Sequence, residues 1–453
     1  MSSQRPGPVP KSTTPFWRTE RHELDTHRST PELPEECDVL IIGAGFAGAA
    51  LAHYIYEDNP SPPSVVILEA REACSGGHLK PDVYFNMPKY IKKYGVKAAV
   101  EVSKFEASQV YAVKQLVEKE KIDCDFVLTR ACDATLHKGL AEETDRAFAE
   151  MVKTGVTDFK DVYHARQEDA ERVSGVKGAL SAFTFTAGHI WPYKLVMHLL
   201  QGVVSKGANL QTMTPVTHVS EHPLPDGRWL VETEQRGSIK AKKVLLATNA
   251  YTADIAPQFK NHIVPVRGIC SRIVVPEGKV KPRLTQTYSI RQGPSMFDYL
   301  IPRLDGSIVV GGAKPNFWSD PSHWYNVKDD SQLIEPAKPY FDGLMQRTFI
   351  GWEDSGAYTD KVWTGIMGYS SDFMPYIGDV PGKPGQMVMA GFSGHGMPLI
   401  LLSAKAVVQM LRHGKRFEET GVPEVFRVTK ERLDSTRNDI LGDNQAGGVK
   451  SKL

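Results

Sequence analysis

The chain contains little cysteine and no excess of charge of either sign. Its 453 residues include five cysteines, which are scattered and form no Cys-x-x-Cys pair. A disulfide framework or a zinc site needs closely spaced cysteines, so we expect neither, and no other metal site. This cysteine usage favours a reducing intracellular environment. The 54 basic and 53 acidic residues leave a net charge of +1, which does not favour nucleic acid or a membrane surface as a partner.

Long hydrophobic runs are missing as well. The most apolar long stretch, residues 387–411, is interrupted by serine, histidine and lysine, so it does not predict a membrane span. The first residues contain no apolar segment, and we expect no secretory signal. Apolar residues make up 41% of the chain and charged residues 24%, which is typical of globular proteins. The length predicts two or three domains.

The last three residues form a recognisable pattern. Ser451-Lys452-Leu453 is typical of the signal that the peroxisomal import receptor binds, and the residues before it are small and polar. We therefore expect a flexible tail over residues 436–453, the import receptor as a partner, and a peroxisomal location. The alternative is a chance match in a cytoplasmic protein.

A glycine-rich turn between two apolar segments is the first motif that indicates chemistry. An apolar run at 38–42 predicts a buried strand, GAGFAG follows, residues 49–56 predict a helix, and 65–69 predict a second strand that ends at Glu69. This order is typical of a dinucleotide site, where the turn and the helix N-terminus hold the diphosphate and the acidic residue holds the ribose. The alternative is a glycine turn in an unrelated α/β protein. The expected cofactor contacts here are Gly43, Gly45, Phe46, Ala47, Gly48, Glu69, Ala70 and Arg71.

Other segments predict ordinary elements. Periodicity favours helices at 106–121, 141–155, 192–205 and 396–411, and strands at 229–232, 244–247 and 387–390. Residues 299–302 and 307–311 flank a turn and predict a hairpin. Residues 1–36 are rich in proline, serine, threonine and charge, so we expect a poorly ordered arm.

Several blocks along the chain resemble a known family. IIGAGFAGAALA, GHIWPYKLVMHLL, VLLATNAY, VPVRG, DYLIPRLDGSIVVGGA, WTGIMGYSSDFMPYIG and AGFSGHGMPLI occur in that order. They resemble the D-amino-acid-oxidase-like family of FAD-dependent oxidoreductases, which includes glycine and sarcosine oxidases, in a fungal form. The resemblance implies a Rossmann-like α/β domain that binds FAD, built from residues 37–105, 185–265 and 363–435. It also implies an inserted α+β substrate domain, rich in strands, from residues 106–184 and 266–362.

The resemblance also implies roles for single residues. Val216 matches the position that pairs with adenine, and the segment Ala247, Thr248 and Asn249 matches a loop near the diphosphate. A later turn matches a helix N-terminus that points at the flavin pyrimidine ring, where it stabilises negative charge. An ordinary turn at the start of a helix is the alternative for this segment, which comprises Gly394, His395, Gly396 and Met397.

One loop departs from the family pattern. Fungal-type relatives are expected to carry a loop resembling SGATGRNGGH, which covers the diphosphate and one flavin face, but this chain has only Ser75-Gly76-Gly77-His78. We still expect Ser75, Gly77 and His78 to contact the cofactor. The missing backbone donors predict weaker binding of FAD. An error in the predicted gene structure is the alternative.

The residues that usually hold the substrate are also different. Met367 stands where glycine-oxidase-like members have an arginine, and Pro398 stands where sarcosine-oxidase-like members have a lysine. Gly365 replaces the cysteine that binds flavin covalently in the latter, so FAD should be non-covalent here. A simple α-amino acid is then a poor substrate, because methionine cannot replace the bidentate arginine. Catalytic residues stay unknown, with His78, His395 and Tyr299 as candidates near the flavin.

These patterns together predict an enzyme that oxidises a C–N bond. The expected substrate is a secondary or substituted amine, or an amino-acid-derived metabolite, with O2 as acceptor and hydrogen peroxide as product. One alternative is a catalytically impaired protein of the same fold that binds a ligand or a partner, which the short loop favours. A second alternative, an NAD-dependent dehydrogenase, leaves the block around residues 394–397 unexplained.

Overall fold

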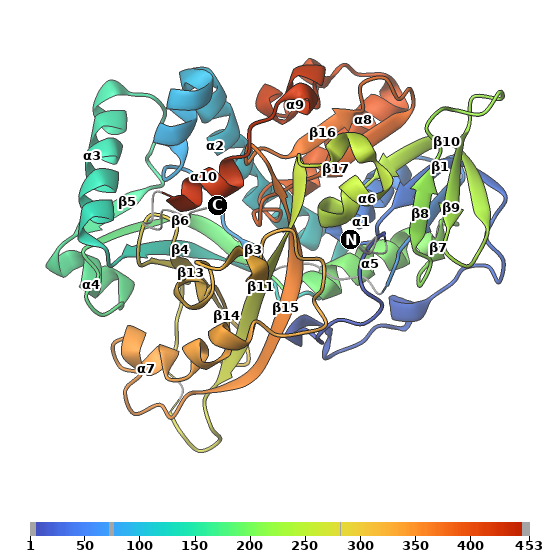
Figure 1. Ribbon diagram of the computed structural model, residues 1–453. Coiled ribbons are helices and arrows are strands. Elements are labelled where there is room, and N and C mark those ends of the chain that lie inside the picture. Colours follow the sequence, from blue (N-terminus) through green and yellow to red (C-terminus); the bar gives the residue numbers. More distant parts are fainter. Residues whose placement is uncertain (1–5, 72–76, 281, 446–453) are drawn as a thin grey trace.

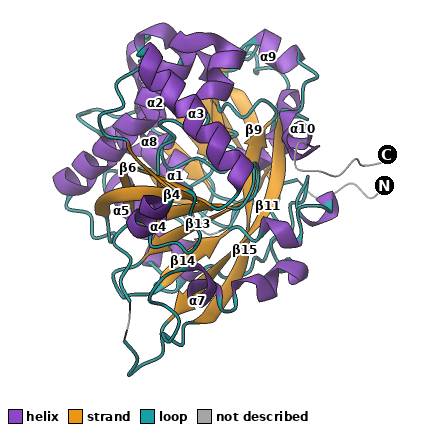
Figure 2. Cartoon of the chain, turned by 90° about the vertical axis from the view of Figure 1, so that its left-hand side faces the viewer, coloured by secondary structure: helices purple, strands orange, loops and turns teal. Residues whose placement is uncertain are grey.

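The computed structural model describes residues 6–71, 77–280 and 282–445, and the side chains of these residues up to 442. Figure 1 shows two sheets side by side with helices around them. In Figure 2 the strands form the middle of the molecule and the helices cover its outside. Ser75 and the segment 451–453 lie outside the described residues, so the expected targeting signal stays a prediction.

The first sheet has the expected strand–turn–helix–strand arrangement. Its main strands run in the order β16-β17-β10-β1-β2-β7, and β8 and β9 extend it from β10. β1 lies between β2 and β10 and is parallel to both. The central strands consist of apolar residues that are buried on both faces, as in other parallel sheets. The strands are β1 (Glu36–Ile42), β2 (Val65–Leu68), β7 (Asn209–Gln211), β8 (Val216–Val219), β9 (Trp229–Thr233), β10 (Ser238–Leu246), β16 (Tyr376–Asp379) and β17 (Gln386–Ala390).

The second sheet is largely antiparallel. Its order is β15-β11-β14-β13-β12-β4-β6-β3, with β5 paired to β6, and only β4 and β12 are parallel neighbours. The hairpin expected from residues 299–311 is present as β13 and β14. The strands are β3 (His78–Leu79), β4 (Val127–Thr135), β5 (Tyr163–Arg166), β6 (Ser181–His189), β11 (Ile263–Val274), β12 (Thr287–Arg291), β13 (Phe297–Pro302), β14 (Ile308–Gly311) and β15 (Tyr358–Ser370).

The α-helices pack mainly against the outer faces of these sheets. The small residues of α1 allow close contact with α5 and α8, and α2 bends at Gly95, whose φ is +85°. The α-helices are α1 (Phe46–Tyr56), α2 (Met87–Glu120), α3 (Lys138–Thr154), α4 (Glu168–Ser174), α5 (Pro192–Val204), α6 (Thr252–Ile255), α7 (Leu344–Thr348), α8 (Ile400–His413), α9 (Lys430–Asp434) and α10 (Asp439–Gln445).

Short 3-10 helices occur mostly in the connections between these elements. They are η1 (Phe16–Arg18), η2 (Glu23–Thr26), η3 (Asn249–Tyr251), η4 (Pro257–Phe259), η5 (Lys314–Asn316), η6 (Pro321–His323), η7 (Glu335–Phe341), η8 (Phe417–Glu419) and η9 (Glu424–Phe426).

The N-terminal arm is packed from residue 6 onward, which differs from the expectation of poor order. Phe16 and Trp17 are only 4% and 5% exposed, and Arg18 forms a buried ion pair with Asp25 at 2.5 Å. The indole of Trp191 also donates a hydrogen bond to the carbonyl of Trp17. Aromatic burial outweighs the proline-rich composition of this segment, because each large ring removes much apolar surface from water.

The expected domain boundaries fall inside long elements. β11 and β15 pair along their whole length, from Ile263 opposite Ser370 to Val274 opposite Tyr358. The expected boundaries at 265/266 and 362/363 cut through these two strands, and those at 105/106 and 184/185 cut through α2 and β6. The division into domains stays a prediction.

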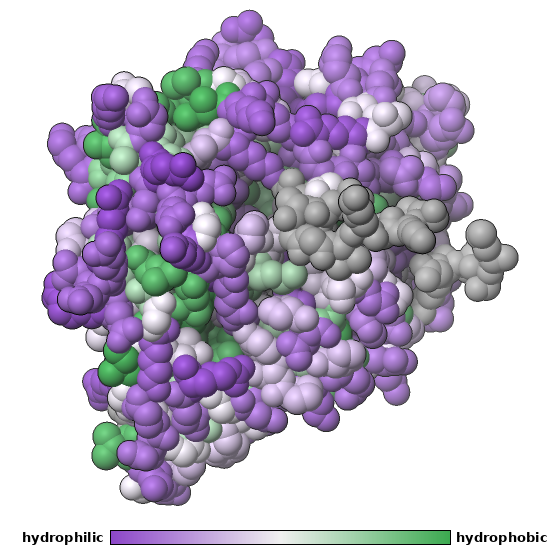
Figure 3. All heavy atoms as spheres, turned by 60° about the vertical axis from the view of Figure 1, so that its left-hand side comes forward, coloured by the Kyte–Doolittle hydropathy of each residue, from purple (hydrophilic) through white to green (hydrophobic). Residues whose placement is uncertain are grey.

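The surface and the helix composition are those of an ordinary globular fold. The face drawn in Figure 3 is mainly hydrophilic, with hydrophobic side chains in separate small groups. Among the described helices, none combines the length and the apolar character that crossing a membrane requires.

Candidate functional site

A cavity of about 770 Å³ lies between the two sheets. One end is lined by the glycine turn after β1 and by the end of β2, and the other end is lined by β11 to β15. The N-terminal arm contributes residues between Gly7 and Arg18 to the wall. The volume lies in the range of pockets that hold a small molecule or a cofactor.

The glycine turn is shaped by steric limits. Gly43 has a φ of +107°, and a Cβ atom there would lie 2.6 Å from the carbonyl oxygen of Ala247. A Cβ atom on Gly48 would lie 1.8 Å from the carbonyl oxygen of Gly43. The turn therefore lets α1 start close to β1, and Gly45, Phe46 and the next residue line the cavity. The first N–H groups of a helix have no partner within it, so this end suits an anion.

Glu69 braces this turn and faces the cavity. Its Oε2 accepts a hydrogen bond from the N–H of Ala44 at 2.8 Å, and its Oε1 accepts one from the N–H of Arg71 at 2.9 Å. A carboxylate has about four acceptor positions, so both oxygens can still accept hydrogen bonds from a sugar diol. Ala70 also lines the cavity, and Arg71 forms an ion pair with Asp330 at 2.8 Å.

The segment after β10 joins two parts of the site. Ala247, Thr248 and Asn249 line the cavity, as does Val216 at the start of β8. The side-chain oxygen of Asn249 accepts a hydrogen bond from the N–H of Gly391 at 3.0 Å. Asn249 thus positions the turn that leads into α8, a role that its spacing in the sequence did not indicate.

That turn lines the cavity but is not the beginning of the helix. Residues 394–399 are not helical, and α8 begins at Ile400. The expected helix over 396–411 therefore starts too early: Leu399 has a φ of −132°, and its N–H donates to the carbonyl of Gly396 three residues before it, as in a turn. Four residues of this turn line the cavity, namely Gly394, His395, Gly396 and Met397.

His395 is paired with a carboxylate on α2. Its Nε2 lies 2.6 Å from Oε2 of Glu106. Burial lowers the pKa of His395, but the charge and the hydrogen bond of Glu106 outweigh burial and raise it. Glu106 therefore favours the protonated form of the His395 ring. Glu106 lies far from the glycine blocks in the sequence, and no motif indicated its role.

His78 and Tyr299 form a neutral polar patch nearby. The two rings are stacked with their centroids 5.7 Å apart, and Nε2 of His78 lies 2.8 Å from the hydroxyl of Thr287. Burial lowers the pKa of His78 well below its usual value, and burial raises the pKa of Tyr299. Both side chains are therefore uncharged at neutral pH, and both line the cavity.

The structure brings most of the expected residues to one cavity. Gly77 lines it as well, whereas Gly48 lies behind the turn and Ser75 falls outside the described residues. Sequence reasoning missed the cationic residues of the wall, because each belongs to a different element and to no motif. These cationic residues include Lys80, Arg291 and Lys314.

The donor groups present fit FAD. Gly43, Glu69 and the N-terminus of α1 supply what a nucleotide diphosphate needs, and a Cβ atom on Gly43 would disturb this cradle. The same cavity is also lined by Met397 and by strands of the second sheet. It therefore offers space for a flavin ring and a substrate in one continuous volume.

Comparisons with known proteins agree with this fit. The profile of the FAD-dependent oxidoreductase (DAO) family matches residues 38–410. Gamma-glutamylputrescine oxidoreductase from Escherichia coli K12 is 24% identical over 399 residues, which span 84% of this chain and 85% of that protein. The probable oxidoreductase OrdL from Rhizobium meliloti 1021 is 23% identical over 382 residues, with 83% of each chain covered.

Solved structures show the same fold. Glycine oxidase from Geobacillus kaustophilus superposes with a TM-score of 0.68 at 20% identity, covering 88% of this chain and 99% of its own. L-amino acid deaminase from Proteus myxofaciens superposes with a TM-score of 0.67 at 16% identity, covering 95% of this chain and 100% of its own. The family match overturns the alternative of an NAD-dependent dehydrogenase and assigns FAD as the cofactor. The chain thus belongs to the DAO family of FAD-dependent oxidoreductases.

Proposed function

We propose that this protein oxidises a C–N bond of a secondary or substituted amine, with O2 as the acceptor of the electrons. The observation that carries the proposal is the single cavity that joins the nucleotide cradle at Gly43 and Glu69 to the neutral patch of His78 and Tyr299. The relatives named above support an amine, since gamma-glutamylputrescine is one.

The protein's own residues would hold the amine in its reactive form. Neutral His78 and Tyr299 offer hydrogen bonds without adding a charge beside the nitrogen, and Thr287 fixes the ring of His78. Buried walls disfavour an ammonium ion, so the amine loses its proton more readily there than in water. When bound, FAD would accept the hydrogen and two electrons that leave the carbon next to nitrogen while the nitrogen loses a proton, which leaves an imine, and O2 would then accept the two electrons with two protons to form hydrogen peroxide.

The substrate is more than a simple α-amino acid. Met367 lines the cavity where related enzymes carry an arginine clamp, and Gly365 also lines it without a cysteine for covalent attachment. A thioether cannot form the bidentate contact that arginine makes with a carboxylate, and glycine has no thiol for covalent attachment of flavin. FAD is therefore held without a covalent bond, and the α-carboxylate has no partner at this position.

Origin and location stay predictions. The relatives named above are bacterial, and the fungal form is a prediction from the sequence alone. A peroxisomal location would suit a product such as hydrogen peroxide. Fluorescence microscopy of an N-terminal fusion, with and without Ser451-Lys452-Leu453, tests the location.

The function is tested with purified protein and a panel of amines. We expect a yellow protein whose blue absorbance band disappears when a secondary amine is added without oxygen, and returns with hydrogen peroxide when air is admitted. A protein that stays yellow with every amine would contradict the proposal and favour the catalytically impaired alternative.

A further inference from the structure

The wall of the cavity on the second sheet carries two cationic side chains around one aromatic ring. Arg291 is the last residue of β12 and is 9% exposed, and Lys314 is the first residue of η5. The guanidinium carbon of Arg291 lies 5.7 Å from the ring centroid of Phe297, and Nζ of Lys314 lies 4.8 Å from the same centroid. Both side chains line the cavity.

Arg291 has donor capacity that the protein itself does not use. Its Nη2 donates to Oδ2 of Asp133 at 3.0 Å, but its buried Nε has no hydrogen-bond acceptor among the described residues. Asp133 is fully buried and also pairs with Lys80 at 2.9 Å. One carboxylate thus pairs with two cations, and the unused Nε of Arg291 favours a further acceptor at the wall.

Lys314 adds a second positive charge with few polar partners. Its Nζ donates to the carbonyl of Ser295 at 3.3 Å and lies 4.3 Å from the ring of Trp318. Burial lowers the pKa of Lys314 to about 8, with Asp298 opposing this shift and Arg291 adding to it. An anion between the two cations would relieve their repulsion and restore charge–charge stabilisation.

This wall lies farther along the second sheet than the neutral patch where the amine is proposed to react. Thr287 of β12 holds His78, Ser289 pairs with Tyr299, and Arg291 pairs with Phe297. Two residues of strand, roughly 7 Å, therefore separate the backbone of Arg291 from the pair that carries Tyr299. An anion held at Arg291 lies on the side of Tyr299 that faces away from Thr287 and His78.

We propose that Arg291 and Lys314 bind a carboxylate that the substrate amine carries at a position remote from the oxidised carbon. The proposal rests on the proposed oxidation of an amine and names its substrate class, which is an ω-amino acid or an amine joined to an acidic amino acid. Because Met367 cannot form the bidentate contact of an arginine with an α-carboxylate, the remote carboxylate supplies the recognition that the usual clamp provides elsewhere.

Direct binding tests the site without turnover. Isothermal titration calorimetry with the holoprotein compares phenylacetate, phenylacetamide and benzylphosphonate, which differ in charge and anion type but share the aromatic ring. We expect phenylacetate to bind at least ~10-fold more tightly than phenylacetamide, as a charge-assisted hydrogen bond requires. Equal affinity would overturn the proposal, and tighter binding of benzylphosphonate would overturn the choice of a carboxylate.

Variants assign the effect to the two residues. Lys314 is half-buried, and Lys314→Gln should weaken the binding of phenylacetate by ~10-fold and leave the binding of phenylacetamide unchanged. Arg291→Lys keeps a charge beside Asp133 and should weaken the binding of phenylacetate by less than ~10-fold. Lys338→Gln is the matched control, because Lys338 is exposed on η7 and does not line the cavity. No change in Lys314→Gln would contradict the assignment.

The pH dependence gives a second readout. Protonated Lys314 binds the anion, so the affinity for phenylacetate should fall as pH rises through about 8, and Lys314→Gln should lose this step. The charged groups that face Lys314 are Arg291 on β12 and Asp298 on β13, and Tyr340 on η7 donates a hydrogen bond to Asp298. A step that persists in Lys314→Gln would overturn its role.

Turnover separates this inference from the proposed function. For an amine with a remote carboxylate, Lys314→Gln should lower kcat/KM by ~10-fold, whereas the same amine with a carboxamide should show no change. If phenylacetate binds as expected but no amine bleaches the flavin, the oxidation is wrong and the anion site stands. If amines are oxidised with no preference for a carboxylate, the anion site is wrong and the oxidation stands.

Discussion

Glu69 shows at the scale of one residue how a side chain can serve the fold and the cofactor together. One of its oxygens accepts a hydrogen bond from the N–H of Ala44 in the glycine turn, and the other accepts one from the N–H of Arg71. We expect the same carboxylate to accept hydrogen bonds from the FAD ribose. Removal of this carboxylate should therefore weaken cofactor binding more than removal of a carboxylate on the surface would.

We expect Glu69→Ala to bind FAD roughly 100-fold more weakly. Hydrogen bonds to a charged group contribute about 1.5–3 kcal/mol each. The loss of two such bonds lowers the affinity by about 100-fold or more, since about 1.4 kcal/mol corresponds to a factor of ten. Titration of the apoprotein, followed by the quenching of flavin fluorescence, measures the change. Glu69→Gln keeps one acceptor oxygen, so its affinity for FAD should lie between those of the wild type and Glu69→Ala. Equal affinity of Glu69→Ala and wild type would show that this carboxylate does not hold the ribose.

Two elements at the scale of a segment surround the nucleotide end of the cavity. The loop that precedes His78 is short in sequence, and residues 72–76 lie outside the described residues. The N-terminal arm is fixed beside this region, since the N–H of Thr13 donates to the carbonyl of Asp330 at 2.8 Å and Asp330 pairs with Arg71. The arm thus supplies wall where the family loop is short.

Deletion of residues 1–14 should speed the release of FAD. The deletion removes the arm residues up to Thr13 from the cavity wall but keeps Phe16 and Trp17, whose burial holds the rest of the arm. The rate at which flavin fluorescence appears after dilution measures release. A shorter deletion that ends before Gly7 is the control. Identical release rates for both deletions would mean that the arm does not retain the cofactor.

Lengthening the loop should tighten the binding of FAD. Insertion of Ala-Thr-Gly-Arg-Asn-Gly after Gly76 restores backbone donors, and two donors to a charged group correspond to ~100-fold in affinity. The change in loop length itself matters little, because doubling a loop changes its closure free energy by about 0.6 kcal/mol. Titration of the apoprotein with FAD provides the measurement. Unchanged affinity and unchanged amine turnover would show that the short loop is not limiting.

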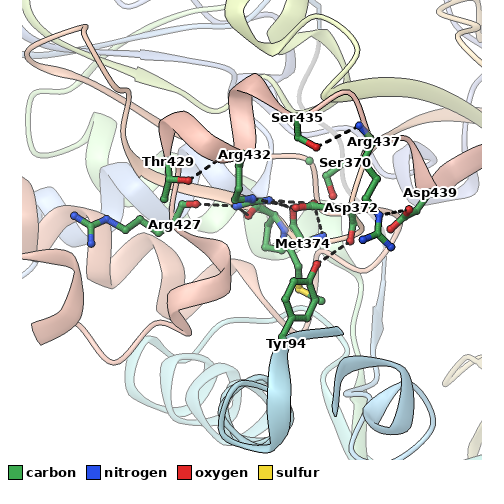
Figure 4. Close-up of polar contacts among 12 residues, drawn as sticks. Tyr94, Ser370, Asp372, Met374, Arg427, Thr429, Arg432, Ser435, Arg437 and Asp439 are labelled. Atoms are coloured by element: carbon green, nitrogen blue, oxygen red, sulfur yellow. Dashed lines mark hydrogen bonds and ion pairs between the residues drawn. The ribbon is translucent and has the colours of Figure 1, made fainter. Parts of the chain in front are cut away.

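At the scale of the whole molecule, the C-terminal segment is fastened to the connection between β15 and β16 and to α2. The guanidinium of Arg432 on α9 binds both oxygens of Asp372, at 3.0 and 3.1 Å, in the connection from β15 to β16 (Figure 4). It also donates to the carbonyl of Met374 and lies 3.9 Å from the ring of Tyr376. Farther along, Asp439 pairs with Lys93 of α2 at 3.0 Å.

We expect Arg432→Lys to lower the free energy of unfolding by about 3 kcal/mol. Lysine cannot form the planar bidentate contact, so two hydrogen bonds to a charged group weaken. Thermal and urea unfolding measure the loss. Arg416→Lys is the control, because its pair with Glu419 is on the surface and should change stability by less than about 0.5 kcal/mol. A loss as small as that of the control would mean that the clamp is not a stabilising contact.

The sequence alone determined the parts of this protein whose signals lie close together in the chain. The glycine turn, the acidic residue directly after β2 and the hairpin of β13 and β14 follow from local sterics and alternation, and they appear in the structure. The family and its cofactor follow from blocks that recur in a set order. Such features need only neighbouring residues, so a pattern is enough to predict them.

Only the tertiary structure decided how the chemistry of the cavity is arranged. His395 meets Glu106 across 289 positions, and Arg291 meets Asp133 across 158. The arm packs on the core although its composition predicts disorder, and α8 starts later than its periodicity predicts. The physical reason is that burial and ion pairing depend on which elements come together in space, and no local pattern records the partner that a buried charge will have.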